Sequence, residues 1–101
     1  MAHETHYLHK IKKLVLDVAA DFSCRIFLFG SRVEGELKRG SDFDIGIEGL
    51  PRRDFLKLKR RITEAVEGST VPHFVDVVDF STVDENFRDI ALKKIEVWKT
   101  S

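Results

Sequence analysis

The chain alternates between two hydrophobic periods, and this alternation limits the folds that it can adopt. Residues 4–20 and 52–67 carry apolar side chains at spacings of three and four, the period of an amphipathic helix. Residues 25–29, 42–48 and 73–80 are short and rich in β-branched or aromatic residues, which is typical of strands. A chain of 101 residues with this order is expected to form one domain of the α/β (α+β) class, with helices covering a small mixed sheet of three or four strands.

The expected strands differ in how their faces are buried. Residues 25–29 form an apolar run, which indicates a strand buried on both faces. In residues 42–48, by contrast, Phe43, Ile45 and Ile47 alternate with acidic residues and a glycine. One face of this second strand is therefore expected in the core and the other is expected to be polar.

The C-terminal part of the chain is expected to end in a helix. Ser81 and Thr82 stand three residues before Asp84 and Glu85, which is the spacing of a capping box at the start of a helix. Apolar residues then recur at helical spacing. This pattern predicts a final helix containing Val83, Phe87, Ile90, Ala91, Ile95 and Trp98.

Charge and cysteine content exclude several classes of protein. Lys+Arg and Asp+Glu are both 17, and a net charge of zero argues against a dedicated nucleic-acid binder. The basic run of Lys57, Lys59, Arg60 and Arg61 is interpreted as the solvated face of a helix. The single Cys24 excludes an intrachain disulfide and is expected in the core. Without a membrane-length apolar stretch or a signal sequence, the expected location is the cytoplasm.

The first candidate functional feature is the sequence Gly30-Ser31-Arg32, directly after the first expected strand. A glycine there lets the backbone turn sharply and approach a ligand closely, and Ser31 adds a hydroxyl. Residues 31–37 are expected to form a short helix or turn, whose first amides could face an anion, and residues 38–41 a loop. Taken alone, a Gly-Ser pair is more often a plain turn.

The other candidates are carboxylates on the expected strands. Asp42 and Asp44 lie two residues apart, which places both on one face of a strand, where they could bind one or two hard cations. Asp76 interrupts an apolar strand, and a carboxylate is costly to bury there unless it is paired or binds metal. Asp79 ends the same run and is interpreted as a turn residue. The alternative for Asp42 and Asp44 is a polar strand face in water.

Together these features have a specific spacing: Gly30-Ser31, ten residues, Asp42-x-Asp44, and a carboxylate in a later strand. This arrangement resembles the nucleotidyltransferase superfamily that includes DNA polymerase β, kanamycin nucleotidyltransferase and poly(A) polymerase. The local sequences around Gly30-Ser31 and Asp42-x-Asp44 look like those of the minimal nucleotidyltransferases of bacteria and archaea. The resemblance covers nearly the whole chain and implies the nucleotidyltransferase fold.

The resemblance also implies a role for each site residue. Asp42, Asp44 and Asp76 would bind two Mg²⁺ ions, or Mn²⁺, with Asp76 also helping to deprotonate the attacking hydroxyl. The glycine, serine and arginine at positions 30–32 would hold the phosphates of a nucleoside triphosphate, expected to be ATP. The implied reaction transfers a nucleoside monophosphate to a hydroxyl and releases pyrophosphate.

Two positions depart from the family pattern, and the first of them keeps a second interpretation open. Glu34 stands where many members have a small or basic residue, and Phe43 replaces the usual Ile or Leu. The alternative to an enzyme is a catalytically inactive module of the same fold that binds a nucleotide or a partner. The resemblance further implies a small helical partner of the HEPN type, in some families as a toxin–antitoxin pair, and a homo-oligomer is also compatible with it.

Overall fold

The computed structural model describes residues 2–30, 43–71 and 75–101, which form three helices and four strands. In chain order these are α1 (Ala2–Val18), β1 (Arg25–Phe29), β2 (Phe43–Glu48), α2 (Arg52–Glu67), β3 (Val75–Asp79), α3 (Glu85–Ala91) and β4 (Glu96–Lys99). None of the helices in the described part of the chain is both long enough and apolar enough to cross a bilayer.

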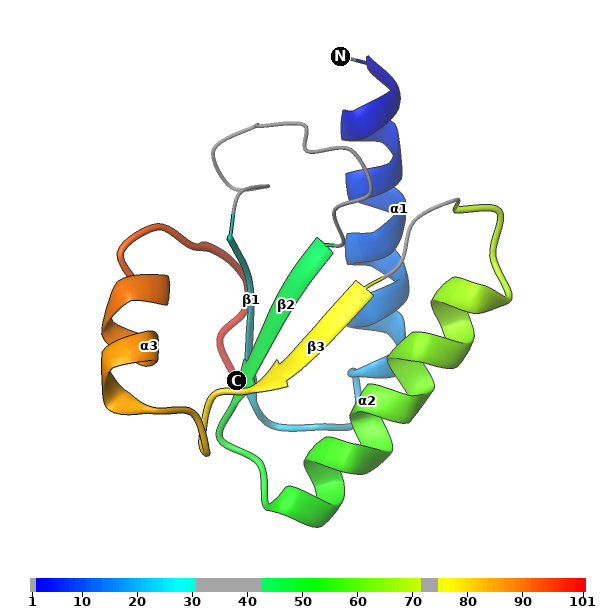
Figure 1. The fold of residues 1–101 in the computed structure, drawn as a ribbon. Helices are drawn as coiled ribbons and strands as arrows, with labels where there is room; N and C mark the ends of the chain where they lie inside the picture. The colour runs from blue at the N-terminus through cyan, green and yellow to red at the C-terminus, as the bar shows by residue number, and fades with distance from the viewer. Residues whose placement is uncertain (1, 31–42, 72–74) are drawn as a thin grey trace.

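The strands form one mixed sheet in the order β3-β2-β1-β4 (Figure 1). β1 pairs antiparallel with both β2 and β4, whereas β2 and β3 are parallel and are connected through α2. Parallel neighbours need such a crossover connection, and α2 supplies it. A mixed sheet of four strands agrees with the fold class expected from the sequence.

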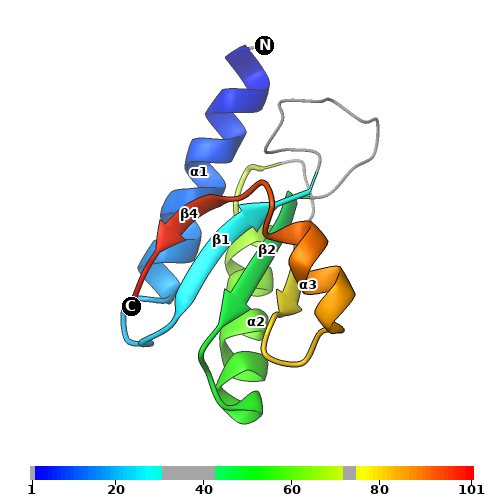
Figure 2. The same ribbon diagram turned by 90° about the vertical axis from the view of Figure 1, so that its left-hand side faces the viewer.

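Helices cover both faces of the sheet, with α1 and α2 on one side and α3 on the other (Figure 2). The larger core lies under α1 and α2, where Phe43, Ile45 and Ile47 of β2 are buried, as the alternating pattern predicts. A smaller cluster of Phe27, Phe29 and Phe80 lies on the α3 side. The first strand is therefore buried on both faces, which confirms the interpretation of its apolar run.

Most boundaries follow the sequence patterns. α2 begins and ends as predicted, and Gly68 follows it. The first helix begins and ends two residues earlier than expected, and β3 occupies Val75–Asp79 within the expected range 73–80. Cys24 is buried, as predicted, and burial raises the pKa of its thiol because the thiolate would lose its hydration.

The expected final helix is wrong in its length and in its cap. α3 ends at Ala91, and Trp98 lies on β4, where it is buried in the larger core. The residues at helical spacing therefore belong to two elements, α3 and β4. β4 forms because the edge of β1 has backbone groups that need hydrogen-bond partners. The N-cap is Asp84, whose carboxylate accepts hydrogen bonds from the amides of Asn86 and Phe87, so neither Ser81 nor Thr82 caps this helix.

Candidate active site

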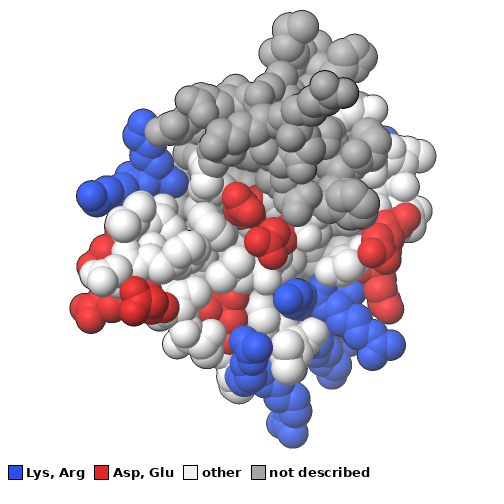
Figure 3. Space-filling model, viewed as in Figure 1, with Lys and Arg blue, Asp and Glu red and all other residues white. Residues whose placement is uncertain are grey.

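Asp44 and Asp76 lie side by side on the neighbouring parallel strands β2 and β3. Their Cα atoms are register partners, so both side chains leave the same face of the sheet, opposite to the Ile45 and Val77 pair in the core. Adjacent strands are about 4.8 Å apart, which brings two carboxylates within reach of a common cation. The pair lies on the α3 side of the sheet, and Figure 3 shows acidic atoms in the middle of this view, beside the grey residues.

Gly30 brings the end of β1 against the carboxylate of Asp44. Its φ is +84°, in the left-handed region that favours glycine, and a Cβ placed there would overlap the Asp44 carboxylate. The preceding residue, Phe29, is the register partner of Asp44 across β1 and β2. The structure thus brings Gly30, just after β1, together with Asp44 on β2 and Asp76 on β3, which are the predicted site residues that it describes.

Three predicted site residues, Ser31, Arg32 and Asp42, lie outside the described residues. The expected short helix, the following loop and Glu34 also lie there. Within residues 2–30, 43–71 and 75–101, no group of three His, Cys, Asp or Glu side chains is placed to hold a metal ion.

Asp76 is exposed, so the argument that it must be paired to offset burial is wrong. The buried carboxylate of β3 is Asp79, which is 6% exposed and lies beside the start of α2. It accepts a hydrogen bond from Arg52 at 3.1 Å and another from the backbone amide of Ser81 at 3.0 Å. These bonds hold the turn after β3, which confirms the interpretation of Asp79 as a turn residue.

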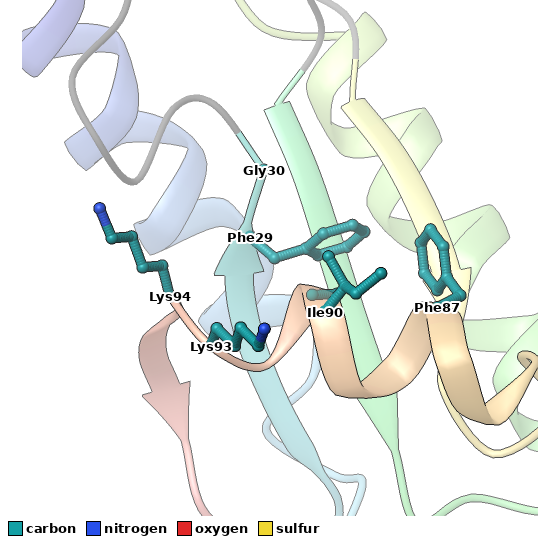
Figure 4. Close-up of a pocket in the computed structure, with 7 residues that line it drawn as sticks. Phe29, Gly30, Phe87, Ile90, Lys93 and Lys94 are labelled. Atoms are coloured by element: carbon teal, nitrogen blue, oxygen red, sulfur yellow. The ribbon is translucent and has the colours of Figure 1, made fainter.

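Sequence reasoning missed a pocket of about 530 Å³ beside Gly30 (Figure 4). Phe29 and Gly30 line it from β1, while Phe87 and Ile90 of α3 line the opposite side. Lys93, in the segment that follows α3, lies at the same pocket. The available signal was the apolar Phe87 and Ile90 pair, which the sequence pattern placed on the final helix and which is exposed in the structure.

The basic run on α2 is exposed, as predicted. Lys57, Lys59, Arg60 and Arg61 all face outward, and the basic side chains in Figure 3 gather largely over this helix. Arg60 pairs with Glu64 one turn along the helix, and Arg61 lies over the ring of Phe22. α2 covers the face of the sheet opposite to Asp44 and Asp76, so this run is not part of the candidate site.

Comparisons with known proteins agree with this geometry. The family model described as "Polymerase beta, Nucleotidyltransferase" matches residues 20–100. MntA of Haemophilus influenzae, named as a protein adenylyltransferase, is 36% identical over 83 residues, which cover 82% of this chain and 70% of that protein.

Solved structures share the fold. One described as a minimal nucleotidyltransferase has a TM-score of 0.69 and 26% identity, over 87% of this chain and 89% of that one. A complex of a tri-AMPylated HEPN toxin from Shewanella oneidensis with an MNT antitoxin matches 97% of this chain and 73% of the other, with a TM-score of 0.58 and 20% identity. The chain therefore belongs to the polymerase beta nucleotidyltransferase family and is of its minimal type.

Proposed function

We propose that this chain transfers AMP from ATP to a hydroxyl group on a HEPN-type partner protein, as one half of a toxin–antitoxin pair. The observation that carries the proposal is the in-register pairing of Asp44 with Asp76, with Gly30 packed against the Asp44 carboxylate. The nucleotide and the partner are inferred from MntA, named as a protein adenylyltransferase, and from the AMPylated HEPN toxin complex. Because the proposed donor is a nucleoside triphosphate, a cytoplasmic location is part of the same proposal.

The residues present fit a site for hard divalent cations. Carboxylate oxygens are the ligands that Mg²⁺ prefers, and Asp44 and Asp76 supply them from adjacent strands. In the proposed site Asp42 completes the set, and two bound Mg²⁺ ions, or Mn²⁺, would neutralise negative charge on the triphosphate. The missing Cβ of Gly30 leaves room for the Asp44 carboxylate. Beside it, in the proposed site, Ser31 and Arg32 would add a hydroxyl and a positive charge for the phosphates.

Asp76 suits the role of proton acceptor because it is exposed and can reach a hydroxyl on another protein. A new bond forms between the acceptor oxygen and the α-phosphorus, while the bond from that phosphorus to the bridging oxygen breaks. Pyrophosphate leaves with the bonding electrons, and the hydroxyl proton passes to Asp76. This chain's task is to align the two oxygens with the phosphorus.

The direct test is transfer of label from α-³²P-ATP to the HEPN-type partner co-purified with this chain, in the presence of Mg²⁺. We expect Asp44→Asn and Asp76→Asn each to lower the rate about 100-fold or more, because each removes a charge that a cation relies on. Asp17→Asn, an exposed carboxylate on α1 outside the site, should leave the rate unchanged.

A second control separates chemistry from folding. Ile45→Ala empties a buried position next to Asp44 and should lower the free energy of unfolding by about 2–5 kcal/mol. Asp44→Asn should instead lose activity at normal stability. Full transfer by Asp44→Asn would refute the proposal and favour the inactive binding module.

A further inference from the structure

We propose that the pocket between the end of β1 and α3 is the subsite for the purine base of the donor nucleotide. This inference rests on the proposed function, since it assigns one part of the same nucleotide. The pocket volume of about 530 Å³ is within the range of small-molecule sites. Figure 4 shows the side chains of Phe29, Ile90 and Phe87 gathered between β1 and α3, with Lys93 and Lys94 on the segment after α3.

The position of the pocket connects it to the carboxylates. Gly30 lines the pocket and also packs against the carboxylate of Asp44. Phe29 likewise lines the pocket and is the register partner of Asp44. A ligand in this pocket therefore stands next to the site, and a nucleotide with its base there can extend its phosphates toward Asp44.

The lining offers aromatic and aliphatic side chains on which a flat base can stack. The rings of Phe29 and Phe87 are nearly perpendicular, at 88°, with centroids 6.1 Å apart, and Phe29 is also held edge-on by Phe80 at 5.0 Å. Phe87 is 44% exposed and Ile90 is 68% exposed, so they present an apolar surface on which a base can stack.

Charge at the pocket points to the same ligand. Lys93 carries a positive charge beside the apolar wall, and the described lining residues include no carboxylate. A nucleoside triphosphate combines an apolar, stackable base with a strongly negative tail. A helix of a partner protein would use the apolar wall but would not account for the contact of the same pocket with Asp44 through Gly30.

The test compares a ligand that carries a base with one that has no base. Both are titrated into the full chain with Mg²⁺ and measured by calorimetry. The ligands are α,β-methylene-ATP, which cannot release pyrophosphate, and inorganic tripolyphosphate. We expect Ile90→Ser and Phe87→Leu to weaken α,β-methylene-ATP about 5-fold or more and to leave tripolyphosphate unchanged. Leu56→Ser, which alters a similarly exposed residue on α2, should change neither affinity.

The outcomes separate this inference from the function on which it rests. If the unmodified chain binds both ligands and transfers AMP, but Ile90→Ser and Phe87→Leu bind α,β-methylene-ATP normally, the base lies elsewhere and only the subsite is refuted. Loss of partner binding by these variants without loss of nucleotide affinity would likewise overturn it in favour of a docking surface. If the unmodified chain binds neither ligand and transfers no AMP, both the proposed function and this subsite are refuted.

Discussion

Gly30 and Gly49 both have a positive φ, at +84° and +103°, but a methyl group at each would meet different surroundings. At Gly30 it would overlap the Asp44 carboxylate, whereas at Gly49 its nearest neighbour would be the Cα of Cys24 at 3.9 Å. A backbone that would strain an alanine is therefore common to both positions, but of the two only Gly30 contacts the site.

This difference predicts that alanine at the two positions will have similar effects on stability but different effects on activity. Gly30→Ala and Gly49→Ala should each lower the free energy of unfolding by about 1–2 kcal/mol, because both place an alanine in the left-handed region. Only Gly30→Ala should also lose AMP transfer, since its methyl group displaces Asp44. Chemical denaturation and the transfer assay measure the two effects, and equal activity of both variants would contradict the assignment of Gly30 to the site.

At the scale of elements, α3 is held to the sheet by few contacts. It has seven residues, all of them at least partly exposed. It packs against the small cluster of Phe27, Phe29 and Phe80. Arg88 of α3 also donates to the Glu48 carboxylate on β2 at 3.0 Å, and Glu48 pairs with Arg25 of β1. A helix this short depends on tertiary contacts and on its cap rather than on its own propensity.

Asp84→Ala should therefore lower the free energy of unfolding by about 1 kcal/mol, because two helix amides lose their acceptor. Asp89→Ala, inside the same helix and exposed, should not destabilise the protein, since alanine is the better helix former. Urea denaturation of both variants measures the difference. Equal stability would show that Asp84 does not cap α3 in solution.

At the scale of the whole molecule, one face of the sheet carries most of the core and the other face carries the candidate site. The face under α1 and α2 holds most of the buried residues, whereas the α3 face combines a small aromatic cluster with the carboxylates and the pocket. The site can thus carry neighbouring negative charges without placing them in the main core. Its ligands should in turn stabilise the folded chain.

Mn²⁺ together with ATP should raise the unfolding midpoint by roughly 6–11 °C at ten times the dissociation constant, since binding to the folded state alone stabilises it. Asp44→Asn should abolish this shift. Without ligand, the same variant should melt at or above the temperature of the unmodified chain, because one of two neighbouring negative charges is removed. Thermal melts with and without ligand measure both effects, and a ligand-induced shift that survives in Asp44→Asn would contradict the metal site.

The sequence by itself determined the elements with a strong period and the spacing of the site. α2 follows its apolar spacing from end to end, and β2 buries Phe43, Ile45 and Ile47 as alternation requires. Asp44 lies with Asp76 because residues in register on parallel strands share a face, once the strands themselves are identified.

Only the tertiary structure decided the features that depend on distant partners. Trp98 lies on a strand because the edge of β1 needed hydrogen-bond partners, and local spacing carries no information about that edge. Asp79 rather than Asp76 is buried because Arg52, 27 residues away in sequence, pairs with it. The pocket likewise exists only where α3 meets the end of β1, since its walls come from segments more than 50 residues apart that no single period relates.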